Sequence, residues 1–254
     1  MGACTASSSR GTTPEELETY KSHHYAALPK TIQGVATNED MLQRLSKGGL
    51  LLLGDIHDDK SLHLLHAQVI QQLIHSKQKL YLHLEFIGTE DEPGVASYLS
   101  GAMDLDELRL QIQERWAGSW MEFQGFDSVF YRRVLMTAKD REIQVRALEP
   151  IPRLDLEKRD RFMAQGITKA LADYPDHLHI VIIGHTHLLG DGHLISLLNG
   201  VDRLAILPRG GRTLTHRLGA FASLHSAAWH APYLVLDEEL WLLNPLPLRS
   251  FGAD

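Results

Sequence analysis

Short, continuous hydrophobic runs alternate with longer segments of helical spacing along most of the chain. A run of four to nine apolar positions bounded by turn residues predicts a strand that is buried on both faces of a sheet. The runs cover residues 49–53, 79–87, 142–150, 179–188 and 203–208, and residues 233–243 predict a final strand or hairpin.

The segments between these runs predict helices. After residue 58, apolar residues recur at helical spacing and give one apolar face, with Asp58, Asp59 or Ser61 as cap. Further helices are predicted over residues 38–45, 155–174 and 194–198, and an irregular, aromatic-rich helical region over 101–139. Strands that alternate with helices predict an α/β fold, in which a mostly parallel sheet has helices on both faces.

Composition narrows the class of protein. The 254 residues are 44% hydrophobic and 22% charged, which is typical of a globular chain long enough to bury a core. A net charge of −7 leaves no basic footprint for nucleic acid or for an anionic membrane surface. Residues 1–14 are small and polar and predict a disordered leader, so we expect a single domain over residues 15–254.

The chain has 15 histidines and one cysteine. One cysteine excludes an intrachain disulfide and a cysteine-rich zinc or iron–sulfur site. A metal ion would therefore be held by nitrogen and oxygen atoms.

Several of the polar residues follow the predicted strands directly. Ligands of parallel sheets bind outside the carboxyl ends of the strands, so these residues should share one rim. They are Asp55, His57 and Asp58 after the first strand, His83 or Glu85 on the second, Glu149 on the third, and His185 and His187 after the fourth. Two of the strands end in the same pattern, since LLLGDIH and VIIGHTH share an apolar run, a glycine and a histidine three residues later.

These motifs resemble the ChaN family, which belongs to a superfamily with the TIKI metalloproteases and the erythromycin esterases. The resemblance rests on Gly54-Asp55-Ile56-His57-Asp58, on His63 and His66, on Glu85 in HLEF, on residues 116–131 and on Gly184-His185-Thr186-His187. It spans roughly residues 45–200. It implies an α/β fold with paired GxxH motifs around one pocket. For the ChaN branch it implies a lipoprotein of haem or iron uptake, and for the other branches it implies hydrolysis.

The resemblance also implies roles for single residues. His57 and His187 close the two GxxH motifs, and Glu85 matches the acidic residue of the second strand. Asp55 stands where the family usually has glutamate, and it is one methylene shorter. His185 is an extra imidazole in the second turn, and Glu149 joins the rim by its strand position alone.

Three hypotheses follow for the chemistry. The first is a haem-binding uptake protein that holds haem, or another small molecule, without covalent attachment and with an axial residue that the sequence leaves open. The second is a metal-dependent hydrolase, whose divalent ion is held by His57, His185, His187, Glu85 and Glu149. Its catalytic residues are His57, Glu85 and Asp55. A variant of this hypothesis needs no metal and uses His57 as the base. The third is a binding protein whose rim is a structural network.

The amino terminus adds a hypothesis about location. Cys4 follows Gly2-Ala3 and precedes a stretch rich in serine and threonine, which resembles the lipidation site of a bacterial lipoprotein. We expect attachment to the cell envelope through a lipid on Cys4, or a cytoplasmic protein if no apolar signal precedes it. Whether the chain forms a homodimer is left open.

Overall fold

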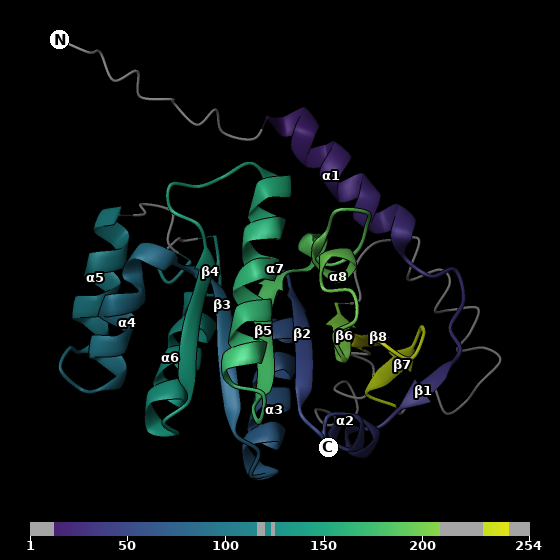
Figure 1. The fold of residues 1–254 in the computed structure, drawn as a ribbon, viewed down its shortest axis with the longest axis horizontal. Coiled ribbons are helices and arrows are strands. Elements are labelled where there is room, and N and C mark those ends of the chain that lie inside the picture. Colours follow the sequence, from purple (N-terminus) through teal and green to yellow (C-terminus); the bar gives the residue numbers. More distant parts are fainter. Residues whose placement is uncertain (1–12, 116–119, 123–124, 209–230, 244–254) are drawn as a thin grey trace, which may run out of the picture.

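Five of the seven strand pairings in the sheet are parallel. The computed structural model describes residues 13–115, 120–122, 125–208 and 231–243. Within them the strands form one eight-stranded sheet in the order β1-β7-β8-β6-β2-β5-β3-β4 (Figure 1). The strands are β1 Gly34–Ala36, β2 Gly49–Asp55, β3 Leu80–Gly88, β4 Gln144–Glu149, β5 Leu178–Gly184, β6 Arg203–Leu207, β7 Tyr233–Val235 and β8 Leu240–Leu243.

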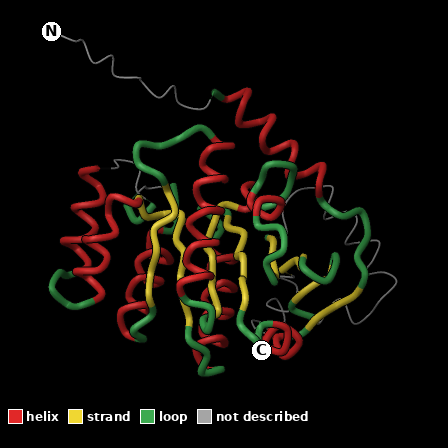
Figure 2. The backbone as a smooth tube through the Cα atoms, in the orientation of Figure 1, coloured by secondary structure: helices red, strands yellow, loops and turns green. Residues whose placement is uncertain are grey.

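Helices cover both faces of this sheet, as the alternation of strands and helices predicts (Figures 1 and 2). They are α1 Pro14–Ala27, α2 Asn38–Arg44, α3 Lys60–His75, α4 Glu92–Leu99, α5 Leu105–Arg115, α6 Ser128–Asp140, α7 Leu156–Asp173 and α8 Leu194–Leu197. Two short 3-10 helices, η1 Thr89–Asp91 and η2 His185–His187, follow β3 and β5.

The strand β2 shows how the two faces are separated. Leu51 and Leu53 belong to a core that includes residues of α3 and α6, whereas Leu50 and Leu52 belong to a second core that includes residues of α7 and α8. Successive side chains of a strand point to opposite faces, so a continuous leucine run fills both cores at once. This is the physical reason for the unbroken apolar pattern.

The predicted strands and the helices predicted over residues 38–45, 155–174 and 194–198 are confirmed, with corrections at their ends. Within the helical region predicted over residues 101–139, residues 116–119 and 123–124 lie outside the described residues. The fourth strand ends at Gly184, because His185–His187 turn into η2. Thr37 caps α2, since its hydroxyl accepts from the backbone N–H of Asp40 and the Asp40 carboxylate accepts from the backbone N–H of Thr37. Asp59 is the cap of α3.

The amino-terminal helix α1 was not predicted. Thr13 and Pro14, which the prediction included in the leader, belong to this helix, because Thr13 caps α1 in a capping box with Glu16 and Pro14 occupies the first helical position. Residues 1–12, with Cys4, lie outside the described residues, and the single-domain boundaries stay a prediction. None of the helices in the described ranges combines the length and the apolar character that crossing a bilayer needs.

Candidate functional site

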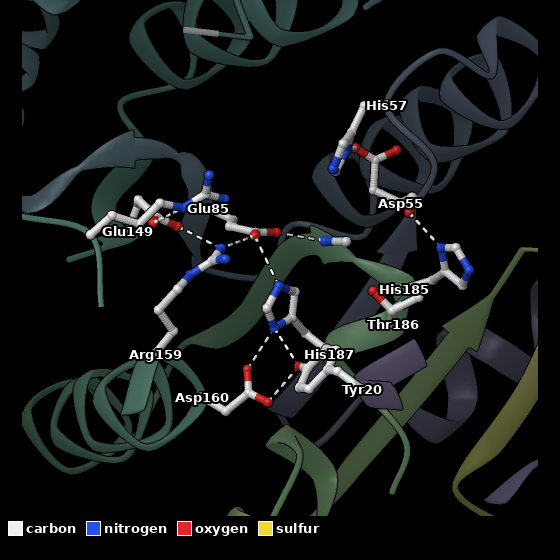
Figure 3. A network of polar contacts seen from close by, with 12 residues as sticks. Tyr20, Asp55, His57, Glu85, Glu149, Arg159, Asp160, His185, Thr186 and His187 are labelled. Carbon is white, nitrogen blue, oxygen red and sulfur yellow. Dashed lines mark hydrogen bonds and ion pairs between the residues drawn. The ribbon is translucent and has the colours of Figure 1, made fainter. Parts of the chain in front are cut away.

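The carboxyl ends of three neighbouring strands bring the predicted residues together. β5 lies between β2 and β3, and Asp55 at the end of β2 pairs in register with Gly184 at the end of β5. Glu85, near the end of β3, borders the same turn from the other side, because the backbone N–H of Gly184 donates to its Oε2 atom at 2.6 Å. Figure 3 shows these groups and their partners.

The first group of the rim centres on Asp55. Its buried carboxylate lies 3.1 Å from Nδ1 of His57 and 2.8 Å from Nε2 of His63, and it accepts a 2.6 Å hydrogen bond from the hydroxyl of Tyr131. Burial alone raises the pKa of Asp55, but the hydrogen bonds from His57 and His63 outweigh it and hold that pKa below its usual range. Asp55 is therefore an ionised anchor that orients the ring of His57.

His57 is the open member of this group. Its side chain keeps 27% of its exposure, whereas that of Asp55 keeps none. The ring lies against Trp120, with 3.8 Å between ring centroids, and meets Phe126 edge-on at 5.0 Å. Nδ1 faces Asp55, and Nε2 has no hydrogen-bond partner among the described residues. With the proton on Nδ1, Nε2 of His57 is thus a hydrogen-bond acceptor at the rim, next to Trp120 and Phe126.

The second group centres on Glu85. Besides the Gly184 backbone, its carboxylate binds Arg159 of α7 at 2.8 Å and lies 3.3 Å from Nε2 of His187. Arg159 also binds Glu149 at 2.7 Å, so one guanidinium joins the two predicted carboxylates. Burial raises the pKa of Glu85, yet His187 and Arg159 more than offset it and lower that pKa. At Glu149 burial dominates, and its pKa is raised.

His187 is fixed from three sides. Its Nδ1 atom lies 2.6 Å from Asp160 of α7 and 2.7 Å from the hydroxyl of Tyr20, which comes from α1 and itself donates to Asp160 at 2.6 Å. Burial lowers the pKa of His187, but Glu85 and Asp160 outweigh it and raise that pKa to about 9. Since both ring nitrogens face carboxylates, His187 is an imidazolium at neutral pH.

An open face of Gly184 separates the two groups. A methyl group at this glycine would lie 3.4 Å from Cε1 of His57, 3.5 Å from Oε2 of Glu85 and 3.6 Å from the ring of His187. These are ordinary contact distances, so the missing side chain leaves room for a ligand atom among the three residues. Three of the sequence-predicted residues, His57, Glu85 and His187, therefore surround one point, and the buried carboxylate of Asp55 lies behind His57.

The predicted metal set is not assembled. Among the described residues, no group of three or more His, Cys, Asp or Glu side chains is arranged to hold a metal ion. His185 turns away, with Nδ1 3.0 Å from the backbone oxygen of Asp55 and Nε2 3.4 Å from the Tyr25 hydroxyl. Arg159 and protonated His187 already supply the positive charge that Glu85 and Glu149 need. A divalent ion held by these five residues therefore does not fit the arrangement.

Several residues of the site were missed by sequence reasoning. Arg159 and Asp160 lie in the first turn and a half of α7, where charged residues look like an ordinary solvated surface. Tyr20 is on a helix that was not predicted, although Thr13 and Glu16 have the spacing of a capping box. Tyr131 lies within the aromatic-rich region that the sequence predicts, with no role of its own, and His63 enters only through the resemblance.

Several solved structures are similar to this chain. The type III effector HopBA1 is similar at a TM-score of 0.50 and 15% identity, over 72% of this chain and 89% of that chain. ChaN of Campylobacter jejuni, whose structure is described for cofacial haem binding, is similar at 0.46 and 10% identity, over 68% of this chain and 86% of that chain. RRSP, a MARTX toxin effector domain from Vibrio vulnificus, is similar at 0.44 and 16% identity, over 72% of this chain and 37% of that chain.

No curated protein matches the chain. A family model does: residues 41–154 match the family described as haem-binding uptake, Tiki superfamily, ChaN. The matched segment contains Asp55, His57 and Glu85, whereas His187 lies beyond it. The resemblance that the motifs indicate is thereby confirmed, because this segment of the chain is similar to the ChaN-like proteins of the Tiki superfamily.

Proposed function

We propose that the chain binds haem at the rim of the sheet, in the service of iron uptake, and that His57 is the residue that contacts it. The supporting observation is the state of the His57 ring: one nitrogen faces a buried carboxylate, the other has no partner among the described residues, and the side chain is 27% exposed. A histidine that ligates a metal almost always donates its other N–H to a carboxylate, carbonyl or water, which fixes the tautomer.

The surroundings of His57 suit a large apolar ligand. Trp120 and Phe126 give the ring an aromatic wall, and the bare face of Gly184 leaves room beside it. Haem needs an axial side chain next to such a wall, and when bound it supplies the iron chemistry itself. The role of the chain is to present Nε2 of His57, to hold Asp55 ionised behind it, and to keep Glu85 neutralised by Arg159 and His187.

Titration of the purified protein with haemin tests this proposal. We expect a stoichiometric shift of the Soret band for the wild type. His75→Gln is a matched control, because His75 is an exposed histidine at the far end of α3 and should leave the titration unchanged. A wild type that shows no saturable Soret shift would overturn the haem proposal.

A second candidate function is hydrolysis without a metal. Asp55 and His57 form a carboxylate–imidazole pair, and Nε2 of His57, which no described residue binds, can take a proton from water as a general base does. An activated ester, p-nitrophenyl acetate, is a suitable first substrate because p-nitrophenolate is a good leaving group. We expect turnover by the wild type and loss of at least about 100-fold in His57→Ala. Equal rates for the two proteins would remove this candidate.

The location of the protein is also a proposal. A lipid on Cys4 would tether the chain to the cell envelope, as the Gly2-Ala3-Cys4 sequence suggests. Metabolic labelling with a fatty acid tests it: label on the wild type and none on Cys4→Ser supports the tether, and an unlabelled wild type removes it. Analytical ultracentrifugation decides between a monomer and the homodimer that the sequence leaves open.

A further inference from the structure

His63 stands between two carboxylates. Its Nε2 atom lies 2.8 Å from Oδ1 of Asp55, and its Nδ1 atom lies 3.0 Å from Oδ2 of Asp127. A carboxylate only accepts hydrogen bonds, so both nitrogens of His63 must carry a proton. The ring is buried, with 2% of its side chain exposed, and stacks on Phe130 at a centroid distance of 4.2 Å.

Asp127 closes a loop back to His57. Its backbone N–H donates to the backbone oxygen of His57 at 2.9 Å, while its side chain binds His63. Asp127 precedes α6, whose Tyr131 donates to the same oxygen of Asp55 that faces His57. The residues thus form a row of alternating carboxylates and imidazoles: Asp127, His63, Asp55 and His57.

This row explains how an aspartate serves at position 55. The carboxylate of Asp55 is saturated by His63 on one oxygen and by Tyr131 and His57 on the other, and no part of it is exposed. Its task is to hold a ring and not to reach into the pocket. Of the two ring nitrogens of His57, only Nδ1 can donate to a carboxylate that is fixed in this way, and the lone pair is then on Nε2.

We propose that His63 and Asp127 are positioning residues for His57, and that they act through Asp55 to hold His57 in the tautomer with its proton on Nδ1. This deepens the proposed function, because it rests on Nε2 of His57 as the ligand-contacting atom. Removal of His63 frees one oxygen of Asp55, and removal of the charge of Asp127 weakens the hold on His63. In both cases Asp55 no longer has one fixed direction toward His57.

The tautomer can be read in the absence of any ligand. Long-range proton–nitrogen correlation spectra of histidine-labelled protein distinguish a protonated ring nitrogen from an accepting one, and His57→Gln assigns the signals of His57. For the wild type we expect a donor at Nδ1 and an acceptor at Nε2. In His63→Gln and Asp127→Asn we expect the ratio of this tautomer to the other to fall about ten-fold. His75→Gln, on the same helix, should give the wild-type spectrum.

Each outcome decides. A tautomer ratio that stays at the wild-type value in a folded His63→Gln or Asp127→Asn overturns the positioning role. If His63→Gln fails to fold, Asp127→Asn decides alone, since it keeps the size of a side chain that is 13% exposed. Haemin titration of the same variants should show binding weakened by about 10- to 100-fold. If the wild type itself binds no haemin, the proposed function fails, while the tautomer measurement still tests the row.

Discussion

The backbone N–H of Gly184 donates a 2.6 Å hydrogen bond to Oε2 of Glu85. This contact joins the second GxxH turn, which follows β5, to the acidic residue of the neighbouring strand β3. It also puts the bare face of the glycine between Glu85 and His57. The glycine therefore has two tasks, since its backbone helps to keep Glu85 ionised and its missing side chain keeps the rim open.

The glycines of the two GxxH motifs should respond differently to the same change. Gly184→Ala adds a methyl group at ordinary contact distances from its three neighbours, so we expect a loss of under about 1 kcal/mol in the free energy of unfolding and a clear loss of ligand binding. Gly54→Ala places its methyl group 3.1 Å from atoms of His185, Leu188 and Pro208, so we expect a loss of about 1–3 kcal/mol. Urea unfolding measures both. A Gly184→Ala variant that binds ligand like the wild type would contradict an open site over this glycine.

The convergence of Asp55, His57, Glu85 and His187 could be predicted from the sequence. Each follows or ends an apolar run, and the ends of parallel strands share one edge. The order of the strands could not be predicted from the sequence, because the placement of β5 between β2 and β3 depends on packing between distant segments. His185 and His187 were both expected at the pocket, but two residues apart in a 3-10 turn they point to different sides.

The positive charge of the site illustrates a second limit. Buried carboxylates at a rim require a cation, and the sequence offered a metal ion held by histidines as one answer. The structure supplies Arg159 instead, from a helix whose sequence resembles any solvated surface. The role of Tyr20 could not be predicted either, because Tyr20 and His187, which it contacts, are 167 positions apart in the sequence.

Arg159 should be among the most sensitive positions of the fold. Arg159→Met leaves Glu85 and Glu149 buried without their shared cation, so we expect the free energy of unfolding to fall by about 3–5 kcal/mol at pH 7. Arg159→Lys keeps the charge and should lose less. The loss in the free energy of unfolding for Arg159→Met should be smaller at pH 5, where the two carboxyl groups can take up protons. A loss of under about 1 kcal/mol at pH 7 would contradict the charge balance described for Glu85.

The protonation of His187 predicts how stability depends on pH. The pKa of His187 is raised from its ordinary 6.5 to about 9 in the folded protein, so its contribution is complete below pH 6.5 and is lost as the pH rises through 9. The shift is worth about 3 kcal/mol. Urea unfolding between pH 6.5 and 9.5 should show this decline, with a smaller slope in His187→Gln. His63, whose pKa is also raised, contributes in the same direction. Parallel curves for the two proteins would exclude a protonated His187.

Helix α1 should be held to the rim by Tyr20. Tyr20→Phe removes hydrogen bonds to Asp160 and His187 at 2.6 and 2.7 Å, and a buried charged group that loses its partner costs about 1–3 kcal/mol. Hydrogen exchange of the α1 amides should then speed up by about ten-fold or more. Tyr25→Phe is the matched control on the same helix. Tyr25 is half exposed, and its hydroxyl lies at the long distance of 3.4 Å from Nε2 of His185. Equal exchange in the two variants would show that α1 is held by other contacts.

Haemin titration of the wild type beside His57→Ala tests whether His57 is the residue that contacts haem. His57 is partly exposed, so its removal should leave the fold intact, which a matched thermal unfolding curve checks. We expect a saturable one-to-one Soret shift for the wild type and binding weaker by at least about 100-fold for His57→Ala. Equal haemin affinity for the two proteins would contradict it.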